Sequence, residues 1–348
     1  MECLERCGID GKDQRLITNL YWNQTAKVRT GETLSEDIRI ECGVRQGCIM
    51  SPTLFNRYTD DIFKVTADLP GIRIHGKNIN NIRYADYTAI LAGFAEELQQ
   101  LVNAVRQAGE QLEMRLNVKK TKVMVMKTQN EEETIPITIK ADDIKLEQVD
   151  RFLYLGQLIT ADGKCREEAI RRIGIAKSTF NKMDNIFKDR HLSMATKLRT
   201  LRCYVISTLL YASDTWTMTA EMEKRIESLE LWFLRRIMKV IWTKKISNVK
   251  IRELIEQKGG RQLYLIKEIR KRKVEYCGHI MRKDGITKLT ITGKGEGKKG
   301  PGRPRRTWLK DIQEWCTYPS NTALIREAEN RQRWTKRLHT TPWMRDVT

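Results

Sequence analysis

The sequence lacks the features that mark a membrane protein, a secreted protein or a disordered chain. Its best apolar stretch, Tyr204–Ala212, is broken by Ser207 and Thr208 and is far shorter than the ~18 residues that a membrane-spanning helix needs. Residues 1–13 carry acids and no apolar run, so no signal peptide is expected. Proline accounts for only 7 of the 348 residues and hydrophobic residues for 40%, as in globular domains. We therefore expect an intracellular protein, nuclear or cytoplasmic, with no membrane partner.

Cysteine is present, but in no pattern that would hold a metal or a disulfide framework. No two cysteines form a C-x-x-C pair, which is the spacing typical of zinc ribbons and redox motifs. Reduced thiols agree with an intracellular setting. The eight cysteines are Cys3, Cys7, Cys42, Cys48, Cys165, Cys203, Cys277 and Cys316.

Acidic residues are outnumbered only in the C-terminal part of the chain. Residues 1–150 hold 20 basic and 23 acidic residues, whereas residues 151–348 hold 44 and 21. The whole surplus behind the formal net charge of +20 therefore lies beyond residue 150. A basic excess in one region predicts a polyanionic partner, of which nucleic acid is the commonest. A surface that merely keeps the protein soluble is the alternative.

Hydrophobic periodicity predicts an α+β protein whose organisation changes near residues 160–164. Helical and strand periods alternate before this point, and helical periods dominate after it. Ala85–Asp86 falls between two strand patterns, at a tight hairpin turn. The expected elements are helices over Ser51–Lys64 and Leu98–Leu112, strands over Ile72–Ile74, Ile79–Tyr84, Tyr87–Leu91, Lys122–Met126, Ile135–Ile139 and Phe152–Leu155, a basic linker over Gly293–Gly302, and closing helices around Trp308–Trp315 and Thr322–Arg337.

The strongest motif pairs a glycine-containing loop with this hairpin turn. Gly43–Pro52 (GVRQGCIMSP) leads into the expected helix, and Tyr84–Tyr87 (YADY) follows further along the chain. The glycine beside Gln46 lets the backbone approach a nucleotide closely, and Arg45 can address a phosphate. A carboxylate at a hairpin tip, such as that of Asp86, can coordinate a hard cation such as Mg²⁺.

These two motifs resemble the palm of the reverse transcriptases of non-long-terminal-repeat (LINE-type) retrotransposons, in which the hairpin is normally Y-A-D-D. The resemblance implies an incomplete right-hand polymerase palm over residues 1–160, a helical thumb over 161–245, a helical C-terminal region over 246–292, and a basic linker with tail helices over 293–348. Other segments similar to the family, in the expected order, are Leu116–Lys122, Phe152–Gly156, Leu209–Trp216 and Gly300–Trp308 followed by Asp311-Ile312 and Trp315.

The resemblance also implies partners, a cofactor and residue roles. The partners are RNA and DNA, as primer–template or duplex, and the cofactor of the family is Mg²⁺. Asp86 would be the catalytic carboxylate and a metal ligand. Contacts to template and incoming nucleotide would come from Arg45, Gln46, Gly47, Ser51 and Lys120.

The sequence departs from the family where catalysis needs carboxylates. The second hairpin aspartate is replaced by Tyr87, a neutral phenol near pH 7. A further aspartate of the family lies upstream of the segment resembled by Cys7–Lys12, and only six residues precede Cys7. Two-metal nucleotidyl transfer needs several carboxylates together. We therefore expect an inactive, truncated polymerase that still binds nucleic acid and holds no productive Mg²⁺.

Several alternatives stay open from the sequence alone. The chain would be an active reverse transcriptase if an upstream segment or a partner supplied the carboxylates, and an unselected product if it folds poorly. Asp86 is either a vestigial Mg²⁺ contact or a turn-forming residue. The adjacent pair Asp60-Asp61 is expected on a solvated helix face rather than at a metal.

A second candidate lies in the basic tail. Gly300–Arg306 (GPGRPRR) resembles an AT-hook, in which arginines enter the narrow minor groove of A·T-rich DNA. Nucleic-acid contact is expected from Arg303, Arg305 and Arg306, as in a DNA-binding architectural protein. A plain linker is the alternative reading of this segment.

Overall fold

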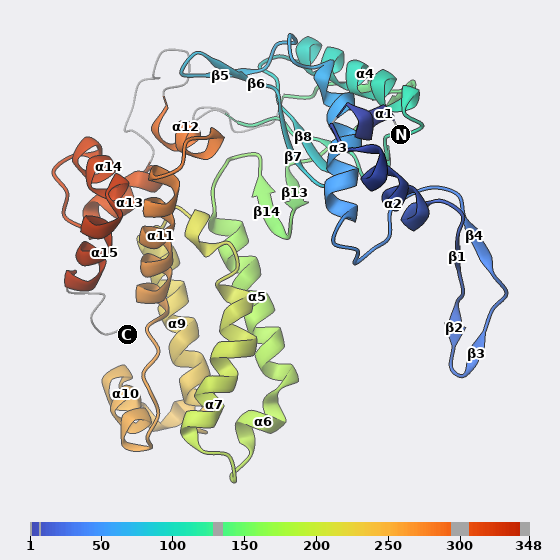
Figure 1. The fold of residues 1–348 in the computed structure, drawn as a ribbon. Helices are drawn as coiled ribbons and strands as arrows, with labels where there is room; N and C mark the ends of the chain where they lie inside the picture. The colour runs from blue at the N-terminus through green and yellow to red at the C-terminus, as the bar shows by residue number, and fades with distance from the viewer. Residues whose placement is uncertain (1, 7, 128–134, 294–305, 342–348) are drawn as a thin grey trace. The chain divides into compact units, whose positions relative to one another are not determined.

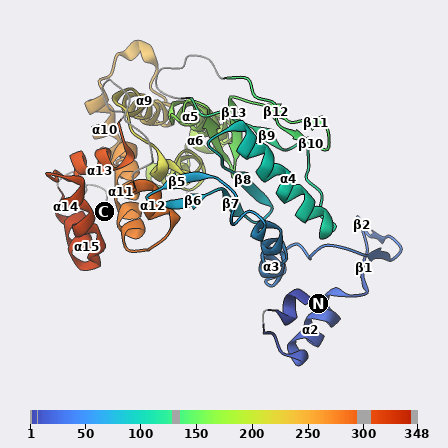
Figure 2. The same ribbon diagram turned by 90° about the horizontal axis from the view of Figure 1, so that it is seen from above.

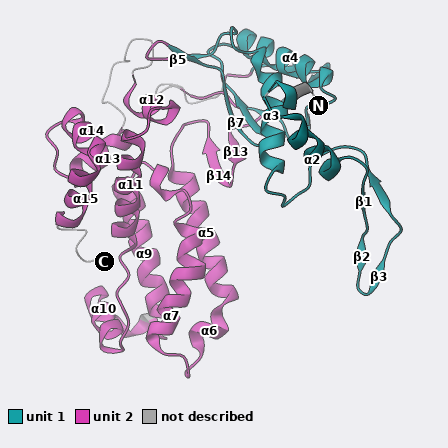
Figure 3. Ribbon diagram, viewed as in Figure 1, with its two compact units in different colours: residues 1–73, 77–123, 137–147 teal, residues 74–76, 124–136, 148–348 magenta. Residues whose placement is uncertain are grey.

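A computed structural model describes residues 2–6, 8–127, 135–293 and 306–341. The chain divides into two compact units, which are coloured separately in Figure 3. Unit 1 comprises Met1–Arg73, Lys77–Val123 and Ile137–Glu147, and unit 2 comprises Ile74–Gly76, Met124–Pro136 and Gln148–Thr348. Helices and strands are mixed, so the α+β fold class is confirmed. None of the described helices is long and apolar enough to cross a membrane.

Unit 1 is built from short helices and short strand pairs. Helices α3 and α4 lie side by side near the β7–β8 hairpin in both views (Figures 1 and 2), and a small core forms where Ile62 of α3 meets Val105 and Ala108 of α4. The elements are α1 (Glu2–Glu5), α2 (Gly11–Tyr21), α3 (Ser51–Lys64), α4 (Ala95–Gln111), and the strands β1 (Gln24–Ala26), β2 (Arg29–Thr30), β3 (Thr33–Leu34), β4 (Ile38–Ile40), β5 (Ile72–Ile74, which reaches into unit 2), β6 (Lys77–Ile79), β7 (Asn81–Tyr84), β8 (Tyr87–Ile90), β9 (Lys122–Val123), β10 (Lys140–Ala141) and β11 (Ile144–Lys145).

Strand pairing in the described residues goes no further than two-stranded sheets. The pairs are β1–β4, β2–β3, β5–β6, β7–β8, β10–β11, β9 with β12 (Glu147–Gln148), and β13 (Arg151–Tyr154) with β14 (Gln157–Thr160). In β7–β8 the register pairs Tyr84 with Tyr87, so the loop between the strands has two residues.

Unit 2 is mostly helical. Its long helices α5, α9 and α11 are seen together in Figure 1, and α9 contacts both of the others. The elements after β14 are α5 (Arg166–Lys182), α6 (Asp184–Lys188), α7 (Met194–Thr200), the π-helical turn η1 (Leu201–Ile206), α8 (Ser207–Leu209), η2 (Ser213–Thr215), α9 (Ala220–Ile237), η3 (Trp242–Lys244), α10 (Asn248–Gln257), α11 (Leu265–Met281), α12 (Ile286–Thr292), α13 (Trp308–Trp315), α14 (Asn321–Glu329) and α15 (Arg331–Thr340).

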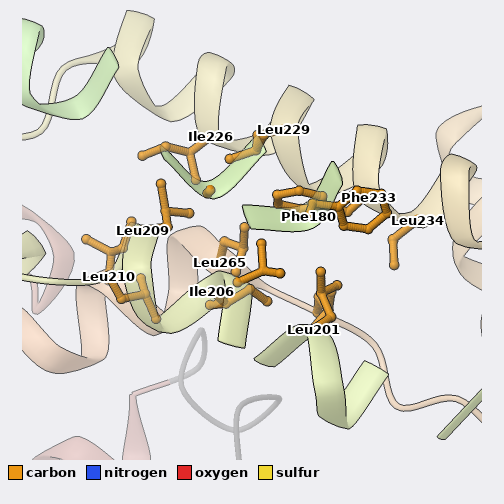
Figure 4. Packing of buried hydrophobic residues seen from close by; sticks show 14 of the residues in the cluster. Phe180, Leu201, Ile206, Leu209, Leu210, Ile226, Leu229, Phe233, Leu234 and Leu265 are labelled. Atoms are coloured by element: carbon orange, nitrogen blue, oxygen red, sulfur yellow. The ribbon is translucent and has the colours of Figure 1, made fainter. Parts of the chain in front are cut away.

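Two apolar clusters hold unit 2 together. The larger one packs helices α5–α11 around aromatic rings. Phe180 and Phe187 are stacked with their centroids 4.3 Å apart, and the Phe233 centroid is 5.0 Å from that of Phe180. Phe180 and Phe233 are labelled in Figure 4. The second cluster joins the end of α11 to α13, α14 and α15. Helix α11 belongs to both, because Ile269 lies in the first and Val274 in the second.

The elements expected from periodicity agree with the structure in part. The helix Ser51–Lys64 and the hairpin around Ala85–Asp86 are confirmed. The strand expected over Ile135–Ile139 is wrong, because pairing begins only at Lys140. The expected strand Lys122–Met126 is paired only at Lys122–Val123, and the helix expected over Thr322–Arg337 is broken at Asn330, whose side chain caps the start of α15.

Candidate functional site

The loop before α3 is tied to the end of α2 by a chain of side-chain hydrogen bonds. The Ser51 hydroxyl donates to the carbonyl of Arg45 (2.7 Å) and lies 3.0 Å from the Tyr21 hydroxyl. The Tyr21 hydroxyl also donates to Cys48 Sγ (3.1 Å), and Arg45 Nε donates to Gln24 Oε1 (2.8 Å). Ser51 is buried whereas Arg45 is exposed. The loop is thus held in one conformation while its basic side chain stays accessible.

This network also changes the acidity of a thiol. The hydrogen bond from Tyr21 and the backbone N–H of Met50 lower the pKa of Cys48 from 9.0 to about 7. The same hydrogen bond raises the pKa of Tyr21. Part of the Cys48 population is therefore thiolate at neutral pH. Sequence reasoning missed Tyr21, because it precedes the motif and lies on another helix.

The rest of the loop presents its backbone to solvent. Gly47 adopts φ +83° and Gly43 φ +94°, in the left-handed region where glycine is favoured. Gln46 lies between them in sequence and is exposed. A nucleotide could reach this backbone without meeting a side chain at either glycine.

Asp86 lies at the hairpin tip, as its sequence position predicts. The β7–β8 loop consists of Ala85 and Asp86 alone, and Ala85 has φ 51°, because a two-residue hairpin needs a left-handed residue at its first loop position. Asp86 is exposed and makes no hydrogen bond or ion pair within the part of the chain that the structure describes. Ala85 and Asp86 therefore form the turn, and the Asp86 carboxylate has no partner among the described residues.

The left-handed alanine gives a test of this turn. We expect Ala85→Gly to stabilise the hairpin by about 1 kcal/mol, because glycine removes the steric cost of a positive φ. Slower hydrogen exchange of the β7 and β8 amides measures the gain. The control is Ala89→Gly in the paired strand β8, which should speed that exchange. Faster exchange in Ala85→Gly would contradict the assigned turn.

The described carboxylates do not form a Mg²⁺ site. No group of three or more His, Cys, Asp or Glu side chains that could hold a metal occurs among the described residues. Asp60 pairs with Arg83 (2.7 Å), and Asp61 pairs with Arg6 (2.9 Å) and Lys64 (2.5 Å). Since Mg²⁺ prefers octahedral oxygen ligation, the single free carboxylate of Asp86 does not fit the family's two-metal centre.

The remaining predicted contact residues lie on separate elements. Lys120 is exposed in a turn after α4, where its backbone N–H donates to Asn117. In the described part of the chain, no hydrogen bond or ion pair joins it to Asp86 or to the loop before α3. The predicted residues Arg303 and Arg305 lie outside the described residues.

The motif Phe152–Gly156 forms the β13–β14 hairpin, and helix α5 holds its tip. Leu155 (φ 47°) and Gly156 (φ 77°) are both left-handed, as in a type I′ turn. Arg171 Nη2 donates to the carbonyl of Gly156 (2.7 Å), and Arg172 donates to the same oxygen. The hydroxyl of Tyr211 donates to the carbonyl of Leu155 (2.8 Å).

A buried carboxylate organises these arginines. Glu168 is 1% exposed and accepts from Arg171 Nε and Arg172 Nε, both at 2.7 Å, and from the backbone N–H of Leu158 (2.9 Å). Burial raises the pKa of Glu168, but these hydrogen bonds outweigh it, so the pKa is lowered. The sequence signal was a Glu followed by Arg three and four residues later on one helix.

A second buried charge network joins the motif Leu209–Trp216 to the tail motif. Lys273 donates to the carbonyl of Trp216 (2.7 Å) and to Asp311, and both charged side chains are fully buried. Asp311 also accepts from the backbone N–H of Met218 (2.8 Å), while Trp308 Nε1 donates to the carbonyl of Asp214 (2.7 Å). Burial lowers the pKa of Lys273, although Asp311 opposes that shift.

Arg306 is engaged within the protein. Its Nε donates to Asp311 Oδ1 (2.5 Å) and its Nη2 to Glu314 Oε2 (2.8 Å). A nucleic acid that used this guanidinium would have to displace two carboxylates. The described part of the tail motif, from Arg306 onward, is therefore tied into the fold of unit 2.

Comparison with known proteins gives the following relatives. Residues 1–159 match the family described as reverse transcriptase (RNA-dependent DNA polymerase). A transposon-derived protein of Caenorhabditis elegans is 24% identical over 253 residues, which are 71% of this chain and 88% of the relative. The retrovirus-related Pol polyprotein from type-1 retrotransposable element R2 of Popillia japonica is 28% identical over 242 residues, or 65% of this chain and 32% of the relative. That of Nasonia vitripennis is 24% identical over 170 residues, or 47% and 17%.

Proposed function

The chain is related to the reverse transcriptases of non-long-terminal-repeat retrotransposons, and from this premise we propose that it binds nucleic acid without polymerising nucleotides. It spans about a third or less of the Pol polyproteins that it matches, so their activities are not transferred whole. In this proposal residues 1–160 are a partial palm, 161–245 a thumb, 246–292 a helical region, and 293–348 a basic linker with tail helices.

The proposed loss of catalysis is inferred from Tyr87, which follows Asp86 at the hairpin. Two-metal transfer places two cations roughly 3.5–4 Å apart and clamps them with carboxylates. Here the hairpin loop offers Asp86, and the next position offers a neutral phenol. Asp60 and Asp61 cannot move to the metals without abandoning their partners, Arg83, Arg6 and Lys64.

Primer extension tests the loss of polymerisation. We expect the purified protein not to extend a primer on an RNA template with Mg²⁺ or Mn²⁺, because one carboxylate does not hold two cations. Tyr87→Asp alone should stay inactive, since it adds a single carboxylate beside Asp86, while Asp60 is held in its ion pair with Arg83 of β7. The matched control is Asp86→Ala. Template-dependent extension above that control would contradict the proposal.

A result of that kind would favour the alternative, an active reverse transcriptase completed by carboxylates from another segment or polypeptide. The two possibilities separate in one further assay. If extension appears only when a second polypeptide is added and disappears in Asp86→Ala, Asp86 is a working metal ligand. If it never depends on Asp86, the residue serves only the turn.

The retained binding rests on charge. Residues 151–348 carry 44 basic and 21 acidic residues, and phosphate contacts by Lys and Arg supply most non-specific affinity for nucleic acid. The loop before α3 contributes the exposed Arg45 to unit 1. We assign the main phosphate-binding surface to unit 2.

A salt titration tests whether the protein binds nucleic acid through phosphate contacts. We expect the logarithm of the affinity for duplex DNA to fall linearly with the logarithm of salt concentration, with a slope near −5 for about six neutralised phosphates. Anisotropy of a labelled duplex measures it. A flat titration would contradict binding through phosphates, and so would equal binding by uncharged and charged backbone analogues of the same duplex.

A further inference from the structure

The helical run from α7 to α8 contains a π-helical turn that changes which residues face solvent. In η1 the side chains of Leu201, Val205 and Ile206 are buried, at 0, 0 and 4% exposure. The wider turn keeps these three on the core side and leaves the consecutive residues Arg202–Tyr204 exposed. π-Helical turns inside α-helices are frequent at functional sites, and this one lies outside every motif considered above.

Two exposed tyrosines lie in this part of the chain. Tyr204 is 61% exposed, and its side chain makes no hydrogen bond within the described part of the chain. Tyr211 is 49% exposed, and its ring is held by Arg172, whose guanidinium carbon is 4.4 Å from the ring centroid. Tyr204 lies in η1, and Tyr211 lies two residues beyond the end of α8.

The segment that carries both tyrosines contains basic and no acidic residues. No acidic residue occurs from Arg190 to Ser213. Arg199 and Arg202 are exposed and make no ion pair within the part of the chain that the structure describes, and Arg202 donates only to the carbonyl of Gln262 (2.9 Å). Neither guanidinium charge is neutralised, so the face attracts a polyanion and repels a basic partner.

We propose that the face formed by Arg199, Arg202, Tyr204 and Tyr211 binds single-stranded nucleic acid, with bases stacked on the tyrosine rings and phosphates on the arginines. The inference rests on the proposed nucleic-acid binding and names its partner. Exposed aromatic rings beside basic side chains are what single-strand-binding surfaces offer, because every base has a face to stack. Bases within a duplex are already stacked on each other and present only phosphates to this surface.

Binding by the full chain tests the proposal. The probes are oligothymidine of about 15 nucleotides, within the size range of single-strand sites, and a blunt duplex of equal length at one salt concentration. Tyr204→Ala should weaken oligothymidine binding roughly 5- to 100-fold and leave duplex binding nearly unchanged. Tyr204→Phe should bind as the unchanged protein does, because the ring is kept. Phe94→Ala, which removes an exposed aromatic ring of unit 1 outside the motifs, is the matched control.

The outcomes separate this proposal from the one that it rests on. If the unchanged protein binds neither probe, both proposals fail. If it binds but Tyr204→Ala binds oligothymidine equally well, only the single-strand face is overturned. A loss of affinity in Tyr204→Phe as large as in Tyr204→Ala would overturn stacking, and a change of oligomeric state in Tyr204→Ala without loss of binding would assign the face to a second copy of the chain.

The rate of alkylation of Cys203, which lies between Arg202 and Tyr204 in the sequence, tests the proposal without any substitution. Cys203 is exposed, so an alkylating reagent can reach it in the free protein. Saturating oligothymidine should slow alkylation of Cys203 severalfold, measured by mass spectrometry, while the duplex should slow it less. Equal rates with and without oligothymidine would overturn the proposal.

Discussion

Replacing Lys273 with methionine is expected to lower the free energy of unfolding by about 3–5 kcal/mol. The substitution removes the partner of Asp311, which is fully buried, so a carboxylate is left in the interior with only Arg306 and the N–H of Met218 to compensate it. The carbonyl of Trp216 loses its donor as well. Methionine has a similar volume to lysine, so the lowered free energy of unfolding comes from the uncompensated charge of Asp311 and not from a cavity.

Urea denaturation followed by tryptophan fluorescence measures this effect. Lys271→Met, on the same helix but partly exposed, is the control and should change stability by less than about 0.5 kcal/mol. Combining Lys273→Met with Asp311→Asn should recover part of the loss, because the amide oxygen still accepts from Met218 without a buried charge. A loss below about 1 kcal/mol in Lys273→Met would show that the pair is solvated.

The second large effect is expected at the β13–β14 hairpin. Glu168→Gln should cost about 3–5 kcal/mol, because Arg172, itself largely buried, then keeps its charge without a counterion. The hairpin tip should loosen with it, since Arg171 and Arg172 both donate to the carbonyl of Gly156. The control is Glu167→Gln, whose ion pair with Arg151 lies at the surface and should contribute less than about 1 kcal/mol.

The same carboxylate gives a pH dependence with a defined sign. The folded pKa of Glu168 lies below its ordinary value of 4.5, so its contribution is fully present above pH 4.5 and is lost as the pH falls through the folded pKa. Acid titration of stability should therefore be steeper in the unchanged protein than in Glu168→Gln. Parallel titrations of the two proteins would contradict the assigned hydrogen bonds.

Sequence patterns predicted the elements whose signals are local. The helix Ser51–Lys64 has proline in its first turn and an apolar stripe. The β7–β8 loop consists of two residues between two strands of alternating pattern. Both elements therefore follow from residues that are close in the sequence. Ile135–Ile139 has the same alternation but no partner strand at that position. Strand formation depends on a distant partner, which the alternation of one segment does not identify.

The site was predictable only where the motif itself carries the function. The exposure of Arg45 and Gln46 and the free carboxylate of Asp86 agree with the positions assigned to them, although their roles stay predictions. Glu168 and Lys273 were not predicted, because charged residues are ordinarily on the surface. Only the structure shows the partners that make their burial tolerable.

The pairing of Lys273 with Asp311 has a consequence for the order of folding. The hydrogen bonds from Met218 to Asp311 and from Trp308 to Asp214 close loops of 93 and 94 residues, and such non-local contacts form late because loop closure costs entropy first. On the ribosome, α11 emerges before α13, so Lys273 cannot be buried with its charge until Asp311 has been synthesised. The two halves of α11 are therefore expected to pack at different times. The half with Ile269 can pack into the first cluster during synthesis. The half with Val274 packs only after Asp311, the counterion of Lys273, has been synthesised.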